Sequence, residues 1–427
     1  MKIKTDILIV GTGAAGLFCA LNIPPRHNIL LITKSSVEES DSYLAQGGIC
    51  MLRDEADYEP YFEDTLRAGH YENRRESVEI MIRSSPEIIS DLIGFGVDFE
   101  RNTDGSLKFT KEGAHSAPRI CFHEDITGKE ITSKLLKEAQ KRKNIRIIEN
   151  TKMVDILTAN GRAIGVAAET AGGEMCEIAA KFTVLATGGI GGLYHNSTNF
   201  PHLTADSIAI AMNHGIELEN IDYVQIHPTT LYSPRKGRRF LISESVRGEG
   251  AILLNAKLER FTDELQPRDV VSKALWKQMY EDDKPYVWLS MENIPTEDIL
   301  THFPNIYRHC LEEGYDITKE CIPVVPAQHY FMGGIHVDKY SKTSMENLYA
   351  VGETACNGVH GKNRLASNSL LESLVFAKRA ARSIGSEFDG CDMIMPDTDI
   401  ESYRGRDRGY VKKVRAEIER LELMHSE

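Results

Sequence analysis

The sequence contains no Cys-x-x-Cys pair, because its eight cysteines are scattered at positions 19, 50, 121, 176, 310, 321, 356 and 391. This spacing argues against a zinc site and against a disulfide framework, so we expect reduced thiols, no metal and a cytoplasmic location. A run of about 18 apolar residues is also missing, so we expect no membrane span. The first strand pattern begins within a few residues of Met1, which leaves no room for a signal peptide.

An excess of positive charge is missing as well. Lysine and arginine number 50 against 63 aspartates and glutamates, and the net charge of −13 argues against nucleic acid as a partner. What is present is typical of a soluble globular protein, with 41% hydrophobic and 26% charged residues, and 427 residues predict two or three domains. One locally basic segment is expected to be a solvated loop: Arg235, Lys236, Arg238 and Arg239.

The N-terminus has the pattern of a βαβ unit. Residues 6–10 (DILIV) are expected to form a strand buried on both faces, and residues 28–33 (NILLIT) a second strand after an intervening helix pattern. Between them lies a G-x-G-x-x-G motif, whose glycines permit a tight turn and a close approach of pyrophosphate to the backbone. The sequence therefore predicts a dinucleotide site at Gly11, Thr12, Gly13, Ala14, Ala15 and Gly16.

The second strand does not end as an NAD site would require. An acidic residue is expected there, but Lys34 and Ser35 occupy the position, and Glu38 and Glu39 come too late in the chain. We therefore favour FAD over NAD, and we include Lys34, Ser35 and Asp206 among the cofactor-binding residues.

Three later segments also favour a flavin. Two predicted strands, 182–186 and 347–351, end in small or acidic residues at the edge where open α/β sheets bind ligands. A glycine-bearing loop at 42–48 offers backbone for the flavin ring, and an acidic group after the later strand could bind the ribityl hydroxyls. The residues concerned are Ser42, Gln46, Gly47, Gly48, Thr187, Gly188 and Glu353.

A helix is predicted to begin at Ser369 and Leu370, within the run HGKNRLASNSLLES. Its dipole would point at the flavin N1–C2=O edge and stabilise the anionic reduced ring. Two interpretations of the preceding turn stay open from these residues alone. Serine and asparagine side chains cap the helix, or the helix start and Arg364 together bind an anion.

The predicted fold class is α/β: a Rossmann-like FAD-binding domain, discontinuous in sequence, with an inserted α+β capping domain and a short C-terminal helical tail. We assign the FAD-binding domain to residues 1–220 and 331–400, and the capping domain to residues 221–330, which are richer in histidine, proline and charge. The tail is residues 401–427. Its strongly charged helix pattern is expected to face solvent or another subunit.

The chain resembles the succinate dehydrogenase/fumarate reductase flavoprotein family, and within it the L-aspartate oxidases. The resemblance covers residues from about 5 to 400, and the motifs occur in the family's order: VGTGAAGL, AQGGI, TKEGAHS, LATGG, HPT, SESVRGEGA, PRDVVSKA, PAQHYFMGGI, LYAVGETA and HGKNRLASNSLLES. It implies noncovalent FAD, because Asp41 stands where members with covalent flavin carry a histidine. Oxidase-type members usually extend into a C-terminal helical domain, of which this chain has only a part.

The resemblance also implies a dicarboxylate site. Arg364 is expected to grip one carboxylate, with further contacts from His227, His329, Ser243 and the backbone beside Glu244. Arg268, in the PRD motif, is expected to transfer the substrate proton. By residue type alone, a surface salt bridge from Arg268 to Asp269 or Asp263 would be the ordinary alternative.

Glu112, in TKEGAHS, is expected to face the α-ammonium of L-aspartate and to disfavour dicarboxylates that lack an amino group. The resemblance thus implies oxidation of L-aspartate to iminoaspartate, with O2 or fumarate reoxidising the flavin. It further implies a transient contact with quinolinate synthase in NAD biosynthesis. Two alternatives stay open, namely a soluble fumarate reductase and a flavin-binding interaction protein that has lost catalysis.

Overall fold

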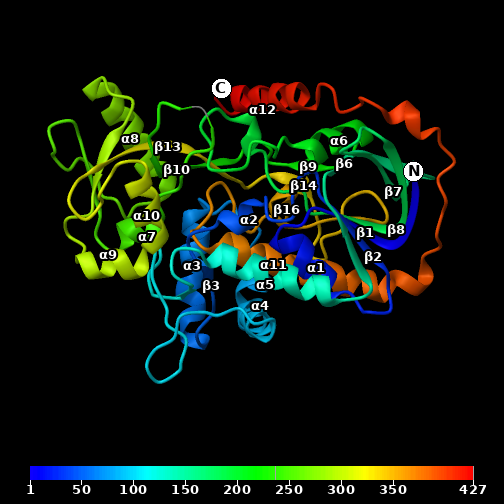
Figure 1. The fold of residues 1–427 in the computed structure, drawn as a ribbon, viewed down its shortest axis with the longest axis horizontal. Coiled ribbons are helices and arrows are strands. Elements are labelled where there is room, and N and C mark those ends of the chain that lie inside the picture. The colour runs from blue at the N-terminus through cyan, green and yellow to red at the C-terminus, as the bar shows by residue number, and fades with distance from the viewer. Residues whose placement is uncertain (236, 427) are drawn as a thin grey trace.

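The computed structural model describes residues 1–235 and 237–426, and its centre is a seven-stranded sheet in the order β5-β2-β1-β8-β7-β6, with β15 paired to β8 (Figure 1). The four strands that the sequence predicts all lie in the parallel part of this sheet, which confirms that prediction. The first and third of them begin earlier than predicted. Their bounds are β1 (Lys2–Val10), β2 (Ile29–Ile32), β8 (Met175–Leu185) and β15 (Leu348–Ala350).

The remaining strands of this sheet are β5 (Ile145–Ile148), β6 (Thr151–Ala159) and β7 (Arg162–Thr170). β5 continues the parallel part beside β2, whereas β6 and β7 form an antiparallel hairpin on the other side of β8. The hairpin turns at Asn160 and Gly161, both with positive φ (52° and 79°), which is the backbone that an Asn-Gly turn supplies. This Asn-Gly dipeptide was the available sequence signal for the hairpin.

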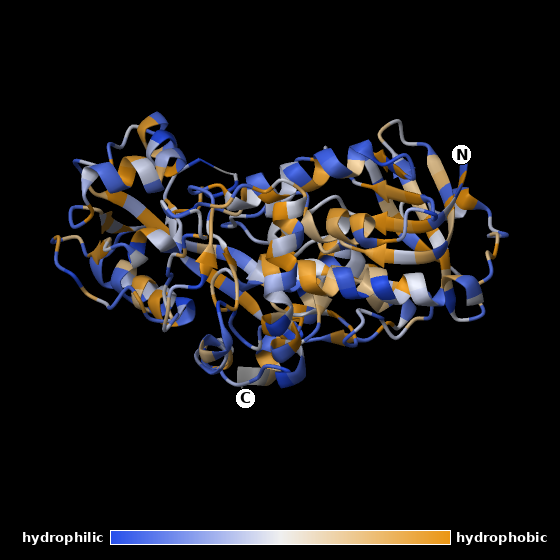
Figure 2. Cartoon of the chain, turned by 90° about the horizontal axis from the view of Figure 1, so that it is seen from below, coloured by the Kyte–Doolittle hydropathy of each residue, from blue (hydrophilic) through white to orange (hydrophobic). Residues whose placement is uncertain are grey.

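Helices cover both faces of the sheet and enclose two hydrophobic cores. On one face, α1 (Ala14–Asn22) packs against α5 (Thr127–Lys141) and α11 (Asn368–Glu387), and α4 (Arg75–Gly94) packs outside α11 (Figure 1). The other face is covered by α6 (Asp206–His214) and α12 (Tyr410–Ser426). Figure 2 shows hydrophobic residues concentrated on the strands and on the inner helix surfaces, as burial of apolar area requires.

The C-terminal tail packs on its own chain, so the expectation of a tail facing solvent or another subunit is wrong for its apolar face. Tyr410, Val414 and Ile418 are buried against α6, and the Arg415 guanidinium donates to the Leu193 carbonyl. The three buried residues recur every four positions, so α12 is an amphipathic helix with a narrow apolar stripe.

A second sheet lies at the other end of the molecule and has its own core (Figure 1). Its antiparallel order is β10-β13-β12-β11, with bounds β10 (Val224–Leu231), β13 (Ile322–Phe331), β12 (Val287–Ser290) and β11 (Ile252–Leu254). The helices here are α7 (Glu244–Gly248), α8 (Arg268–Asp282), α9 (Thr296–His302) and α10 (Pro304–Glu312). This inserted α+β unit confirms the predicted fold class.

Short elements join the two units. A three-stranded sheet is formed by β16 (Ala355–Cys356), β14 (Gly334–His336) and β9 (Leu218–Glu219), and β3 (Ile49–Cys50) pairs with β4 (Ile120–Cys121). The short helix α2 (Asp41–Leu44) and the longer α3 (Tyr58–Ala68) complete the framework. Across the described ranges, none of the helices is both long and apolar enough to cross a membrane.

Candidate active site

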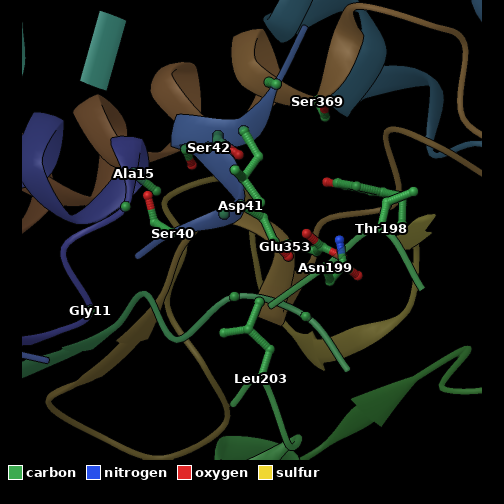
Figure 3. Close-up of a pocket in the computed structure, with 18 of the residues that line it drawn as sticks. Gly11, Ala15, Ser40, Asp41, Ser42, Thr198, Asn199, Leu203, Glu353 and Ser369 are labelled. Carbon is green, nitrogen blue, oxygen red and sulfur yellow. The ribbon is translucent and has the colours of Figure 1, made fainter. Parts of the chain in front are cut away.

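One continuous cavity runs from the glycine-rich turn after β1 to the inner edge of the second sheet. Residues from α2, from the loop before α6 and from the segment after β15 line its middle part (Figure 3). The structure brings most of the predicted cofactor-binding residues to this cavity: Gly11, Thr12, Gly13, Ala15, Lys34, Ser42, Gln46, Gly47, Gly48, Thr187, Gly188, Asp206, Glu353, Ser369 and Leu370. All seven predicted catalytic residues line it too: Glu112, His227, Ser243, Glu244, Arg268, His329 and Arg364.

The glycine-rich turn leaves no room for side chains. A Cβ added to Gly11 would lie 2.0 Å from the Ala186 carbonyl oxygen, and Gly11 has φ +118°. A Cβ added to Gly16 would lie 2.2 Å from the Gly11 carbonyl oxygen. The first glycine therefore lets the ends of β1 and β8 meet, and the third lets α1 pack on the turn.

Three predicted cofactor-binding residues, Ala14, Gly16 and Ser35, are not among the cavity's lining residues. Gly16 supports the turn from behind, and the Ala14 backbone N–H donates to the Ser42 hydroxyl at 3.2 Å. The Ser35 hydroxyl donates to the Glu39 carboxylate, which does line the cavity. The sequence predicts that Glu39 comes too late in the chain to bind the ribose. The loop after β2 folds back, however, and brings Glu39 to this end of the cavity.

Lys34 and Asp206 form an ion pair at the same end of the cavity. The Lys34 ammonium donates to the Asp206 carboxylate at 2.6 Å and to the Thr204 hydroxyl at 3.1 Å. Asp206 is also the first residue of α6. The pair fixes the start of α6 at this end of the cavity.

The middle of the cavity contains polar atoms that a flavin dinucleotide could satisfy. Within the described residues, Oδ2 of Asp41 and Oε1 of Gln46 are buried without a hydrogen-bond partner. From the part of the chain that the structure describes, the Glu353 carboxylate accepts one hydrogen bond, from the Phe331 N–H at 2.9 Å, which leaves acceptor capacity for hydroxyl groups. Unsatisfied buried acceptors are rare in folded proteins, so these atoms fit a polyhydroxyl chain such as ribityl.

Asp41 and Glu353 are acidic side chains in a poorly hydrated place. Burial raises the pKa of Asp41 to about 7, and burial together with the Asp41 charge raises the pKa of Glu353 to about 8. At neutral pH the apoprotein therefore holds a proton that an unfolded chain, with an ordinary glutamate pKa near 4.3, has released.

This difference predicts a pH-dependent stability of the apoprotein. Because the folded state binds the extra proton, rising pH favours the unfolded state throughout the window from about pH 4 to pH 8. We expect the apoprotein melting temperature to fall across this window, and we expect Glu353→Gln to make the fall shallower. Thermal melts of both apoproteins from pH 5 to pH 8 measure the slopes, and parallel curves would contradict the assignment to Glu353.

The start of α11 has no side-chain cap within the described chain. Ser367 occupies the N-cap position in the left-handed region (φ 62°), and its hydroxyl does not bond the helix's first N–H groups. The simple capping interpretation of this run is therefore wrong. The first-turn N–H groups at Ser369 and Leu370 stay available to an electron-rich group in the cavity.

Arg364 reaches the cavity from the same turn. Its guanidinium donates to the Ser369 hydroxyl at 2.6 Å and lies 4.3 Å from the Tyr330 ring centroid. Its Nε is buried and, among the described residues, has no acceptor. Burial, together with the nearby Arg268 charge, lowers the pKa of Arg364 to about 10, so the group stays charged at neutral pH. A buried cation with a free donor is suited to a carboxylate.

Arg268 begins α8 and is 6% exposed, so it is not the surface arginine that residue type alone suggested. Its Nε donates to the Glu244 carboxylate at 2.5 Å, and its Nη1 donates to the Gln225 side chain at 2.8 Å. Burial alone would raise the pKa of Glu244, but Arg268 and Arg247 outweigh it and lower that pKa below the ordinary value. The alternative partner Asp269 instead lies 3.3 Å from His70.

Gln225, on β10, connects this arginine to the turn before α11. Its amide nitrogen donates to the Asn363 side chain and to the Arg364 carbonyl, each at 2.8 Å. Gln225 is 2% exposed, so the bridge is shielded from water. Arg268 and Arg364 are thus held in one buried network.

Glu112 is 3% exposed and carries no cationic partner from the described chain. It accepts hydrogen bonds from the Ser245 hydroxyl at 2.8 Å and from the Ser367 hydroxyl at 2.6 Å. Burial and the Glu244 charge raise its pKa above the ordinary value. A buried carboxylate fixed by two hydroxyls, with lone pairs left over, can receive an ammonium group.

Ser243 and Glu244 form the start of the short helix α7. The Ser243 hydroxyl accepts the Ser245 N–H at 3.3 Å and is therefore the N-cap of this helix. Glu244 turns its side chain toward Arg268, so a substrate carboxylate could reach only the backbone of Glu244 while that ion pair lasts.

Several residues that complete the site are not predicted from the sequence: Gln225, Ser245, Arg247, Tyr330 and Ser367, and the segment 196–199. Four of these residues, Ser245, Arg247, Tyr330 and Ser367, lie inside the family motifs SESVRGEGA, PAQHYFMGGI and HGKNRLASNSLLES, which are the available sequence signal. The basic segment also differs from expectation, because Arg239 is buried and donates to the Asn196 side chain, and Arg238 lines the cavity. Lys236 lies outside the described residues.

Comparisons with known proteins agree with this geometry. A family model described as an FAD binding domain matches residues 6–370. An L-aspartate oxidase of Clostridium perfringens is 50% identical over 408 residues, which cover 95% of this chain and 92% of that protein. One of Neisseria meningitidis is 40% identical over 417 residues, covering 95% and 83%. A solved structure of the E. coli quinol fumarate reductase has a TM-score of 0.86 at 29% identity, covering 98% of this chain and 74% of that one.

Proposed function

The chain belongs to the succinate dehydrogenase/fumarate reductase flavoprotein family, and from that premise we propose that the cavity is the active site of an FAD-dependent L-aspartate oxidase. The two relatives of this name described above share 50% and 40% identity with 95% of the chain. The observation that carries the proposal is the buried Glu112 carboxylate, which has no ion-pair partner among the described residues and lines the same cavity as Arg268 and Arg364. A dicarboxylate with an amino group matches this charge distribution.

The reaction removes a hydride from Cα of aspartate and one proton from its ammonium group, which leaves protonated iminoaspartate. FAD, held noncovalently, supplies the hydride acceptor when bound. The chain's own residues must therefore hold two carboxylates, orient the Cα–H bond and manage the proton. Each of these tasks can be assigned to named side chains.

Carboxylate binding is assigned to Arg364, with His227 and His329 as neutral hydrogen-bond donors. Burial, together with the Arg268 charge, lowers the pKa of both histidines well below the ordinary value. They stay uncharged at neutral pH, so Arg364 provides the main positive charge for the carboxylate, and the imidazoles orient the carboxylate by hydrogen bonds. Ser243 and the backbone beside Glu244 complete the second carboxylate pocket.

Amino-group recognition is assigned to Glu112. In its position between Ser245 and Ser367 it has lone pairs left for an ammonium group, and the arrival of that cation lowers the cost of its burial. Succinate and fumarate leave the same charge unpaired. The carboxylate therefore favours aspartate both by attraction and by rejection of its competitors.

Proton handling is assigned to Arg268. Its contact with Glu244 gives it a carboxylate through which a proton could pass, and the Gln225 bond fixes the orientation of the guanidinium. An isolated arginine is too basic for this task. Arg268 is only 6% exposed, so bulk water does not compete for the contact through which the proton would pass.

A soluble fumarate reductase is the second candidate, because the solved quinol fumarate reductase shares the fold closely. That activity would use the same carboxylate contacts and Arg268 in the reverse direction. It gives no reason for a buried, unpaired Glu112. We therefore assign fumarate to the role of electron acceptor, alongside O2.

An anaerobic flavin titration tests the proposed function. We expect L-aspartate to bleach the flavin band of the purified holoenzyme and succinate to leave it unchanged. The matched second arm adds fumarate to the aspartate-reduced enzyme and follows the return of absorbance. No bleaching by aspartate, with rapid reoxidation of chemically reduced enzyme by fumarate, would replace the oxidase with a fumarate reductase.

The product also bears on location and partners. Iminoaspartate is an imine that water hydrolyses, so an enzyme that consumes it gains from being close by. We infer a cytoplasmic reaction that supplies quinolinate and so NAD biosynthesis, with a transient contact to quinolinate synthase. Co-sedimentation of the two purified enzymes in the presence of aspartate would test that contact.

A further inference from the structure

His227 and His329 face each other across the substrate end of the cavity, with ring centroids 5.1 Å apart and planes at 69°. Each neutral imidazole carries a single proton, on either Nδ1 or Nε2. The nitrogen that bears it decides whether the ring donates to a ligand or only accepts from one. That choice is set by the partner of the other nitrogen.

Backbone groups contact one ring nitrogen of His227 and leave the other free. The Thr229 N–H lies 3.2 Å from Nδ1 and can donate to it, and the Thr229 carbonyl lies 3.1 Å from Nδ1 and can accept from it, so the backbone allows either tautomer of His227. Nε2 is buried and, within the described residues, has no partner. A ligand in the cavity is therefore needed to complete the hydrogen bonding of His227.

For His329 a side chain makes the choice. The Thr198 hydroxyl lies 2.7 Å from Nδ1 of His329, which is the distance of a strong hydrogen bond. The other acceptor within its reach, the Gln328 carbonyl, is 3.5 Å away and already receives the Thr198 N–H at 3.0 Å. The Thr198 hydroxyl is therefore best oriented to donate its proton to Nδ1 of His329, which leaves the proton of the ring on Nε2.

The segment that carries Thr198 is fixed to the strand that carries His329. The Ser197 hydroxyl donates to the Gln328 side chain at 2.6 Å, and the Asn199 amide donates to the His329 carbonyl at 3.2 Å. Thr198 and its neighbours are 5% exposed. The hydroxyl is thus held against Nδ1 from both sides.

We propose that Thr198 is a positioning residue that keeps the proton of His329 on Nε2, so that this ring presents an N–H to a substrate carboxylate oxygen. Without the hydroxyl, the His329 proton can move to Nδ1, and Nε2 would then turn a lone pair toward the carboxylate. The inference rests on the proposed function, because a carboxylate is a ligand that needs an N–H donor at this position.

Two substitutions separate the hydrogen bond from packing. Thr198→Val keeps the branched shape and cannot donate, whereas Thr198→Ser keeps the hydroxyl. We expect Val to weaken succinate binding, measured from the flavin difference spectrum, by about tenfold or more, as for one lost hydrogen bond to a charged group. Ser should stay within about threefold. Equal weakening by both variants, or none by Val, would overturn the proposal.

The tautomer itself can be observed without turnover. In histidine labelled with ¹⁵N, the protonated and unprotonated ring nitrogens resonate far apart, and the His329 signals are assigned by their loss in His329→Gln. We expect the wild-type holoenzyme to show His329 protonated at Nε2, and Thr198→Val to lose that preference. A wild-type proton on Nδ1 would overturn the proposal, even if the variant failed to fold. Failure of the oxidase assignment would leave this spectrum unchanged.

Discussion

Arg268→Lys is expected to slow the reduction of bound flavin by L-aspartate by about 10³-fold, within the range found for removal of a proton-transfer group. Lysine keeps the positive charge but is a point donor, and it cannot reach Glu244 and Gln225 together as the arginine fork does. Anaerobic stopped-flow at saturating aspartate measures the rate. Flavin content, measured in the same sample, shows that the fold and the cofactor site persist.

Arg260→Lys is the matched control for this experiment. Arg260 also pairs with a glutamate of the same inserted unit, Glu264, at 2.6 Å, but its side chain is 55% exposed. Lysine can still pair with Glu264, and Arg260 does not line the cavity, so this variant should keep the wild-type rate of flavin reduction. A rate for Arg268→Lys within about threefold of wild type would remove Arg268 from the chemistry and leave it a structural role.

Glu112→Gln is expected to raise KM for L-aspartate by about 10- to 100-fold, the loss of one charge-assisted hydrogen bond to the ammonium group. Glutamine has nearly the same shape, and its carbonyl can still accept from Ser245 or Ser367, so the pocket should stay intact. Binding of succinate should be unchanged or tighter, because the unpaired charge has gone. Steady-state kinetics and flavin difference spectra give the two constants.

The informative quantity is the ratio of the two effects. Glu124→Gln, at an exposed glutamate in the same part of the chain, should change neither constant. If aspartate and succinate both bound more weakly to Glu112→Gln by the same factor, Glu112 would be a structural carboxylate. The distinction between oxidase and fumarate reductase would then need another residue.

The cofactor half of the site was predictable because its signals are local. Gly11 follows a strand within one tight turn, and Glu353 follows another strand directly, so their spacing already contains the geometry. Parallel strands end at a common edge, which brings these residues together without knowledge of the tertiary fold. The position of Glu39 could not be predicted in this way, because the loop between the end of β2 and Glu39 is longer than in the usual dinucleotide-binding pattern.

The substrate half depends on contacts that no local pattern encodes. Glu112 meets Ser245 and Ser367, which are 133 and 255 residues away in the chain. The hydroxyl that contacts Nδ1 of His329 belongs to Thr198, which is 131 residues earlier in the chain. Family motifs could name Glu112 and His329, but their partners follow only from packing of the inserted unit on the first sheet, and the roles assigned to them stay predictions.

Gln225 has a consequence for how the two arginines of the site stay together. It belongs to the second sheet, yet its amide nitrogen holds the turn before α11 while its carbonyl holds Arg268. If the second sheet moved away from α11, the Gln225 contacts would break together with the Ser245–Glu112 hydrogen bond. Arg268 and Arg364 would then lose the side chain that links them, so the two arginines keep their relative positions only while the second sheet stays packed against this turn.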